Sequence, residues 1–225
     1  MSALYNVRTR GDGAESPSAG FAPSSIPEAK SSPTGASVRY AHDPTKNWYV
    51  LRATYERAQR VYDFIVADQK DSDAYIAMHF VKKNIGGKQK RVKEPLVAGL
   101  VFVYCTEGQI REYVHKTPPI NFVRYYYNRC IVNADGTNPV MRVDYAKMMN
   151  FIRVTSVDDD NLMQIDPEYV HYVSGDMVCV TSGKFAGVKG RVARAAGQRR
   201  VIVELEGLAL IATAYIPAAC LEKCE

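Results

Sequence analysis

Residues 175–192 read Gly-Asp-Met-Val-Cys-Val-Thr-Ser-Gly-Lys-Phe-Ala-Gly-Val-Lys-Gly-Arg-Val. The alternation of apolar residues around Met177 and Val180 predicts a short strand, and glycines at positions 183, 187 and 190 predict a sharp bend before a second strand. Glycine accepts positive φ angles and close backbone approach, so three glycines within eight residues are typical of the corners of a small β-barrel.

Outside this segment, length and composition limit the possible classes of protein. The chain has 225 residues, enough for two compact units and a tail. Its five cysteines show no CxxC pairing, so we expect reduced thiols and a cytoplasmic location. No apolar run approaches the roughly 20 residues that span a bilayer, and membrane insertion is not expected.

The charge is unevenly distributed along the chain. The net charge is +5, and residues 47–156 hold 17 Lys and Arg against 10 Asp and Glu. Residues 157–172 hold five acidic residues and no Lys or Arg. A basic middle region followed by an acidic connector indicates an anionic partner for the middle region, although a surplus of this size also serves solubility alone.

The first 46 residues are rich in Ser, Pro, Gly and Ala and show neither a helical nor a strand period. Such a segment buries too little apolar surface to offset the entropy of ordering it, so we expect a disordered tail at 1–46.

Residues 47–156 predict an α+β domain of helices over an antiparallel sheet. A buried strand at 48–51 precedes an amphipathic helix that follows Thr54 and ends near Gln69. Thr106 and Gln109 fit a capping box for a second helix, and Asp144 is a candidate N-cap for a third. A strand is expected at 74–81, and a hairpin around Gly86-Gly87 carries six cations, Lys82, Lys83, Lys88, Lys90, Arg91 and Lys93.

The acidic stretch 157–172 predicts a coil that joins this domain to the barrel at 173–225. A coil of 16 residues spans roughly 20 to 25 Å and would leave the orientation of the two modules free. Strands at 201–205 and 210–215 would complete the barrel, and Leu221 would close it.

The two modules in this order resemble NusG-like transcription elongation factors. The bend Gly-x-Phe-x-Gly-x-x-Gly at 183–190, with its Arg-Val exit, resembles the KOW motif, which also occurs in ribosomal proteins. Trp-Tyr-Val-Leu at 48–51, the basic hairpin, Glu-Pro-Leu at 94–96 and Phe-Val-Arg at 122–124 resemble the N-terminal domain of the family. The resemblance implies a NusG N-terminal-type antiparallel sheet with helices, followed by a small SH3-like KOW β-barrel.

The resemblance implies three binding surfaces. An apolar concavity would bind the clamp helices of RNA polymerase, and cations would bind the nontemplate DNA strand of the transcription bubble. The KOW module would bind a ribosomal protein or the terminator Rho. The matching polymerase-binding positions are Val97, Leu100, Phe102 and Phe122. The nucleic-acid-binding positions are Arg57, Arg60, His115, Lys116, Thr117 and the six hairpin cations. The KOW partner-binding positions are Phe185 and Leu208. Each apolar position is equally compatible with ordinary core packing, and each charged one with a solvated surface.

One departure from the family narrows the resemblance. Val97-Ala98-Gly99-Leu100 stands where housekeeping members usually have an aromatic-Pro-x-Tyr string, which puts the polymerase contacts there in doubt. With the long leader and the apolar run at 206–217, the chain looks like specialised paralogues that antiterminate capsular-polysaccharide operons in Bacteroides-type bacteria. The alternatives are a housekeeping factor that recruits Rho, a KOW-containing ribosome or RNA-binding protein, and a C-terminal module that switches folds.

The sequence contains no pattern for catalysis or cofactor binding. The four histidines lie in four different segments, and HExxH, GxSxG and the Walker spacing are absent. Cys220 and Cys224 have no second pair that would complete a zinc site. We therefore expect a non-enzymatic protein without a metal or cofactor.

Overall fold

The computed structural model describes residues 39–224 apart from 55–56, 69, 196 and 206. Of the tail expected to be disordered at 1–46, residues 1–38 therefore lie outside the described residues. Residues 39–46 differ from the expectation. Tyr40 is buried, its ring meets Trp48 edge-on at 5.1 Å between centroids, and its hydroxyl donates to the carbonyl of Ala74. The fold therefore begins before the predicted start at Asn47. The ring of Tyr40 supplies the apolar surface that packs this segment against the core, although the residues around it are polar.

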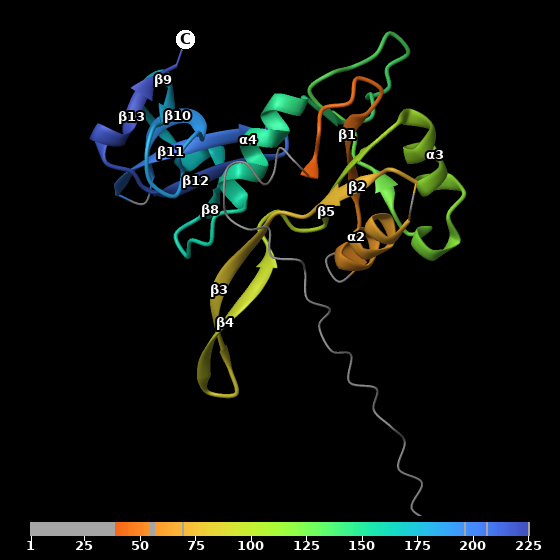
Figure 1. The fold of residues 1–225 in the computed structure, drawn as a ribbon, viewed down its shortest axis with the longest axis horizontal. Helices are drawn as coiled ribbons and strands as arrows, with labels where there is room; N and C mark the ends of the chain where they lie inside the picture. The colour runs from red at the N-terminus through yellow and green to blue at the C-terminus, as the bar shows by residue number, and fades with distance from the viewer. Residues whose placement is uncertain (1–38, 55–56, 69, 196, 206, 225) are drawn as a thin grey trace, which may run out of the picture.

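The first sheet is antiparallel and has β5 and β1 at its centre (Figure 1). Strand β5 (Leu100–Cys105) pairs with β1 (Asn47–Arg52), with Phe102 opposite Val50, and with β2 (Asp73–Tyr75). Two short strands, β6 (Arg124–Tyr125) and β7 (Arg142–Val143), pair with β1 on its other side. All six residues of β5 are buried, as expected for a strand covered on both faces.

Helices cover both faces of this sheet. Helices α2 (Ala58–Ala67) and α3 (Glu107–His115) share a core cluster with Leu51, Val101 and Val103, and we call this side the helix face. Helix α4 (Tyr145–Thr155) packs on the opposite side, where Trp48, Val50 and Phe102 point. Successive strand residues alternate between the two clusters, as the period of two requires.

The predicted helix starts are confirmed for two of the three helices. Thr106 forms a complete capping box with Gln109, and the Asp144 carboxylate accepts from the backbone N–H of Lys147. The cap expected at Thr54 differs, since α2 begins after Arg57 and no side chain caps it.

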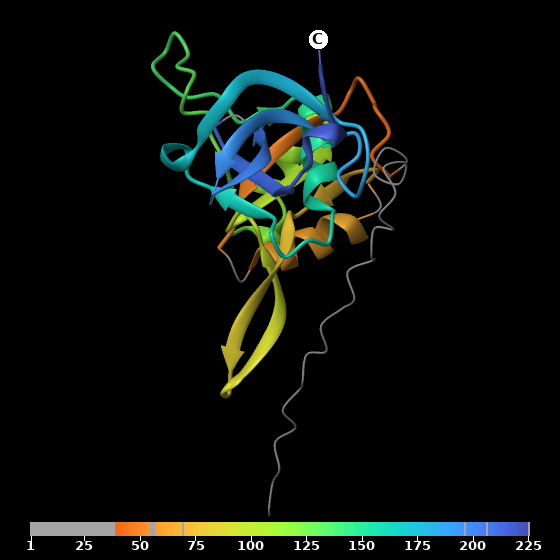
Figure 2. The same cartoon turned by 90° about the vertical axis from the view of Figure 1, so that its left-hand side faces the viewer.

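The basic hairpin is confirmed and projects from the body of the molecule (Figures 1 and 2). Strands β3 (Met78–Ile85) and β4 (Lys88–Pro95) pair only with each other, through a two-residue turn in which Gly86 and Gly87 have φ angles of 60° and 76°. The single strand expected at 74–81 is instead divided at Ile76 and Ala77, because β2 stays in the sheet and β3 leaves it.

The C-terminal region forms a six-stranded antiparallel sheet in the order β13-β9-β10-β11-β12-β8. Its strands are β8 (Met163–Ile165), β9 (His171–Val180), β10 (Lys189–Ala195), β11 (Gln198–Leu205), β12 (Ala209–Tyr215) and β13 (Leu221–Lys223). Within the described residues β8 and β13 are not paired, so the closure expected at Leu221 is not found. Strand β8 comes from the stretch predicted to be a coil, and its Ile165 lies opposite Leu210.

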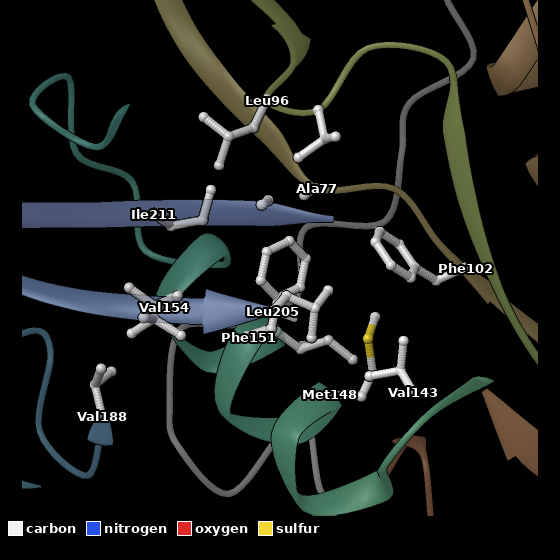
Figure 3. Packing of buried hydrophobic residues seen from close by; sticks show 14 of the residues in the cluster. Ala77, Leu96, Phe102, Val143, Met148, Phe151, Val154, Val188, Leu205 and Ile211 are labelled. Carbon is white, nitrogen blue, oxygen red and sulfur yellow. The ribbon is translucent and has the colours of Figure 1, made fainter. Parts of the chain in front are cut away.

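The two sheets are joined by one continuous apolar core with α4 at its centre (Figure 3). This shared core runs from Phe102 in the first sheet through Phe151 of α4 to Leu205 and Ile211 in the second. Asp159 of the connector is buried as well. The expectation of two modules on a free tether is therefore wrong for this conformation, because both sheets bury apolar residues against the same helix.

Candidate binding surfaces

Three of the four apolar positions predicted to bind polymerase lie in the shared core. Val97, Leu100 and Phe102 are all buried, and the Phe102 ring lies 5.4 Å from that of Phe151, centroid to centroid. Figure 3 shows Phe102 directed toward α4, with Leu205 and Ile211 of the second sheet close to the same helix. In this conformation α4 and the C-terminal sheet cover the surface that these residues would offer to a partner.

Polar contacts fix α4 to both sheets. The Asn150 side chain makes two bonds to the backbone of Lys189, donating to its carbonyl at 2.7 Å and accepting from its N–H at 2.8 Å. Arg153 donates to the carbonyl of Gly187 at 3.0 Å. On the other side, the hydroxyls of Tyr75 and Thr155 are 2.6 Å apart. The bonds to Lys189 and Gly187 satisfy backbone groups at the interface. Together with the contact between Tyr75 and Thr155, they specify one arrangement of the two sheets.

Phe122, the fourth predicted polymerase-binding residue, lies on the helix face. Its half-buried ring packs against the core of α2 and α3. The guanidinium carbons of Arg57 and Arg60 lie 5.1 and 5.8 Å from the ring centroid, within the range of cation–π attraction. The structure thus separates Phe122 from the other three apolar positions and places it with two predicted nucleic-acid-binding residues.

A row of three rings, His115, Tyr125 and Tyr127, lies along the same side of the first sheet, and we call it the aromatic strip. His115 and Tyr125 have centroids 5.7 Å apart, and Tyr125 and Tyr127 have centroids 6.3 Å apart, both with their planes tilted edge-to-face. Burial raises the pKa of Tyr125, although the guanidinium of Arg111 acts against this, so its phenol stays neutral at physiological pH. Of these rings only His115 was predicted to bind nucleic acid.

The residues that follow α3 have different roles. The Thr117 hydroxyl donates to the carbonyl of Glu112 and so closes the end of the helix. Lys116 is exposed. Thr117 is therefore a structural residue here, whereas His115 and Lys116 remain available to a ligand.

Two of the six hairpin cations are used in ion pairs inside the protein. Arg91 forms ion pairs with Asp158 and Asp160 of the connector, and its guanidinium lies 3.7 Å from the centroid of Phe80. Lys83 pairs with Glu94. The Arg91 contacts fix the middle of the hairpin to the acidic stretch that follows α4, whereas the Lys83–Glu94 pair joins the two strands of the hairpin.

The remaining cations face solvent along the hairpin. Lys82, Lys88 and Lys90 are exposed, and no ion pair with a described acidic residue is found for them. Lys93 is exposed as well, with its amine 5.7 Å from the centroid of Phe80. Lys83 lies directly opposite Lys90 in the pairing register. Like charges opposite each other destabilise a strand pair, so an anion that bound here would relieve that repulsion.

The two predicted partner-binding residues of the C-terminal sheet differ in exposure. Phe185 is buried in the shared core and is a packing residue in this conformation. Leu208 is half-buried at the turn between β11 and β12, where its N–H donates to the carbonyl of Leu205.

The residues placed by the structure include no group of three or more His, Cys, Asp or Glu side chains that could hold a metal ion. Among the described helices, none combines the length and apolarity needed to span a membrane.

Comparison with known proteins gives a partial match. Residues 46–135 match the family model described as "Transcription termination factor nusG". No curated protein matches the sequence. A solved structure titled "Domain interaction in Thermotoga maritima NusG" is similar with 19% identity and a TM-score of 0.38, over 80% of this chain and 98% of that one.

Proposed function

We propose, with the NusG-family match over residues 46–135 as the premise, that this protein binds transcribing RNA polymerase and regulates elongation. We propose further that it is a processive antiterminator that serves a particular operon, of the kind that acts on capsular-polysaccharide genes. The observation that carries the proposal is the match itself. It includes the first sheet up to β6, the basic hairpin and the helix face, which together hold all the predicted nucleic-acid-binding residues.

The proposed contact with nontemplate DNA uses two sets of exposed side chains, most of them cations. Arg57, Arg60, His115 and Lys116 belong to the helix face, and the exposed lysines of the hairpin project beyond the body of the molecule. Phosphates are bound by such cations without regard to sequence, and this suits a factor that stays with polymerase along the whole length of an operon.

The proposed contact with the clamp helices of polymerase requires a change of conformation. Val97, Leu100 and Phe102 become accessible only if the C-terminal sheet and α4 move away from the first sheet. Each large apolar side chain contributes about 1.5–3 kcal/mol when buried, so separation costs several kcal/mol that the polymerase contact must offset. We propose that docking and separation occur together.

For the C-terminal region we propose a KOW-type module at 173–225, with β8 as an added edge strand. Once separated, it would recruit a second protein, either a ribosomal protein or Rho. Leu208 is accessible in the present conformation, whereas Phe185 would contribute only if the module were to repack.

An elongation assay with purified RNA polymerase and the full-length protein tests the proposal. The template carries a long untranslated leader with terminators, and full-length transcript is measured with and without the protein. Antitermination predicts more readthrough at several successive terminators. Equal readthrough, under conditions where co-sedimentation shows polymerase binding, would contradict it.

A second candidate function is termination, which the name of the matched family, "Transcription termination factor nusG", favours. In that case the protein would recruit Rho through its C-terminal module and shorten transcripts. The same assay with added Rho separates the two candidates, because termination predicts earlier transcript release whereas antitermination predicts longer transcripts.

A further inference from the structure

Tyr127 is the tyrosine of the aromatic strip that is open to a ligand. The Tyr127 side chain is a large apolar group that is 49% exposed, while Tyr125 behind it is half-buried against the core of the helix face. Tyr127 is paired with Val140 by an isolated bridge, and the N–H of Asn128 donates to the carbonyl of Pro139 at 2.9 Å. The backbone on both sides of the ring is therefore held in place.

Several cations, on the helix face and next to the strip in the sequence, lack the acidic partners that cations elsewhere have. Lys46, Lys70, Arg91 and Lys184 each form an ion pair with an Asp or Glu. In contrast, no ion pair with a described acidic residue is found for the exposed side chains of Arg57, Arg60, Lys116 and Arg129. Arg124, beside Tyr125, donates to the backbone carbonyls of Asn121 and Val123. The helix face and the residues next to the strip in sequence thus carry exposed cations that an anion can contact.

A half-exposed ring beside exposed cations matches the chemistry of an unpaired nucleotide. The ring offers a flat apolar surface on which a base stacks, and the cations bind the phosphates on either side of that base. A duplex cannot use such a ring, because its bases are already stacked on one another. An acidic peptide would need the cations and would gain little from the ring.

We propose that Tyr127 is a stacking platform for a base of single-stranded DNA, with Tyr125 in edge-to-face contact with its ring and His115 packed in turn against Tyr125. The strand's phosphates would contact Arg129 and the cations of the helix face. This inference rests on the proposed function and adds to it a base-binding residue outside the predicted set. The edge-to-face contact between Tyr125 and Tyr127 orients the Tyr127 ring in advance, so little side-chain entropy is lost on binding.

Fluorescence anisotropy with a labelled single-stranded DNA of mixed sequence and the full-length protein tests the proposal. Loss of one base–aromatic stack costs about 1–3 kcal/mol, so Tyr127→Ala should weaken binding by about 5- to 100-fold. Tyr127→Phe keeps the ring and should bind within about twofold of the wild type. Tyr215→Ala is the matched control, because it removes a tyrosine that is 57% exposed on β12, in the other sheet.

Salt dependence separates stacking from charge and from loss of structure. Each phosphate contact with a single strand contributes about 0.7 to the slope of log K against log salt. Tyr127→Ala should leave that slope unchanged, whereas the double variant Arg57→Gln, Arg60→Gln should lower it by about 1 to 1.5. A merely structural role for Tyr127 would instead lower the thermal unfolding midpoint of Tyr127→Ala along with its binding.

Several outcomes would overturn the proposal. They are unchanged binding by Tyr127→Ala, duplex bound as tightly as single-stranded DNA, RNA of the same sequence bound more tightly than DNA, or no binding by the wild type. These outcomes are distinct from failure of the proposed function. If Tyr127→Ala binds normally and the wild type still alters elongation, only the stacking inference is wrong. If stacking is demonstrated and elongation is unaffected, only the proposed function is wrong.

Discussion

At Gly99 the backbone has a φ angle of +72° immediately before β5, and a Cβ atom built there would lie 2.6 Å from the carbonyl oxygen of Ala53. The N–H of Ala53 donates to the carbonyl of Gly99, so the two segments are in direct contact. Any side chain at this position would force β1 and β5 apart at their ends.

We therefore expect Gly99→Ala to lower the free energy of unfolding by about 2–4 kcal/mol, from left-handed strain together with the clash. Gly136→Ala is the matched control, because Gly136 has a similar φ angle of +79° and open space around it. It should cost only about 1 kcal/mol. Urea unfolding of the two variants measures the difference, and equal losses would show that the contact with Ala53 is unimportant.

Asp159 is the buried carboxylate that connects the acidic stretch to the glycine-rich bend. Burial alone would raise its pKa, but the ion pair with Lys184 and two hydrogen bonds from Asn161 outweigh it and hold the pKa below its usual range. A depressed pKa in the folded state means that the stabilisation is complete above the unfolded-state pKa of about 4. It is lost as the pH falls through the lower, folded value.

Replacing this carboxylate should therefore change how stability depends on pH. Asp159→Asn should lower the free energy of unfolding by about 1–3 kcal/mol at pH 7 and by much less near pH 3. The exposed Asp166→Asn serves as the control. Chemical unfolding at several pH values measures this, and a loss that stays constant down to about pH 3 would contradict the assigned ion pair.

At this scale the sequence predicts local contacts well and distant ones poorly. The pairing of Thr106 with Gln109 follows from three-residue spacing alone, and it is confirmed. The strip of His115, Tyr125 and Tyr127 depends on where α3 ends relative to β6, which no local spacing specifies. The only signal in the sequence is the run of three tyrosines between Arg124 and Arg129.

Among the elements, the β3–β4 hairpin is the clearest candidate for binding an anion by charge alone. Replacing Lys82, Lys88 and Lys90 by Gln should weaken single-stranded DNA binding and lower the salt slope by up to about 2. Since the replacement also removes cross-strand repulsion, folding stability should not fall. Lys147→Gln on α4 is the control, and an unchanged slope in the triple variant would remove the hairpin from the DNA-binding surface.

Helix α4 determines whether the two sheets stay together. Asn150→Ala removes two hydrogen bonds to Lys189 and should destabilise the covered arrangement by about 1–2 kcal/mol. If polymerase binds only the separated form, the variant should bind polymerase about 5- to 30-fold more tightly. Exposed Gln164→Ala on β8 is the control. Weaker or equal polymerase binding by Asn150→Ala would contradict the requirement for separation.

Element prediction succeeded where one residue pattern determines the structure. Gly86-Gly87 between two basic segments predicts the hairpin, and Asp144 before an apolar period predicts α4. Strand β8 was missed because Met163 to Ile165 is too short and too weakly patterned to predict a strand. It forms because β12 offers an unpaired edge.

At the scale of the whole molecule, the shared core connects both sheets, and this should govern how the protein unfolds. Trp48, the single tryptophan, is buried at the end of that core formed by the first sheet. Strands of the second sheet form the other end. We expect tryptophan fluorescence and far-ultraviolet circular dichroism to report one transition with the same midpoint in urea. Two midpoints separated by more than about 0.5 M would indicate independent modules, since the usual urea slope makes that difference about 1 kcal/mol.

The arrangement of the sheets could not be predicted from the sequence. Val97, Leu100 and Phe102 have the residue types of a core and equally those of a docking surface, and their spacing is the same in either case. Which role they have depends on whether Leu205 and Ile211, which lie more than a hundred residues later in the chain, pack against them. Sequence periodicity identifies which face of an element is apolar, but it does not identify what covers that face.

The burial of Tyr40 has a practical consequence for anyone who trims the protein for crystallisation. A shortened chain that starts at the first strand would lack the ring that lies against Trp48 and the Arg39 guanidinium that pairs with Asp73. Such a chain would expose an indole to water and would tend to self-associate through it. Removal of the leader should therefore stop before Arg39.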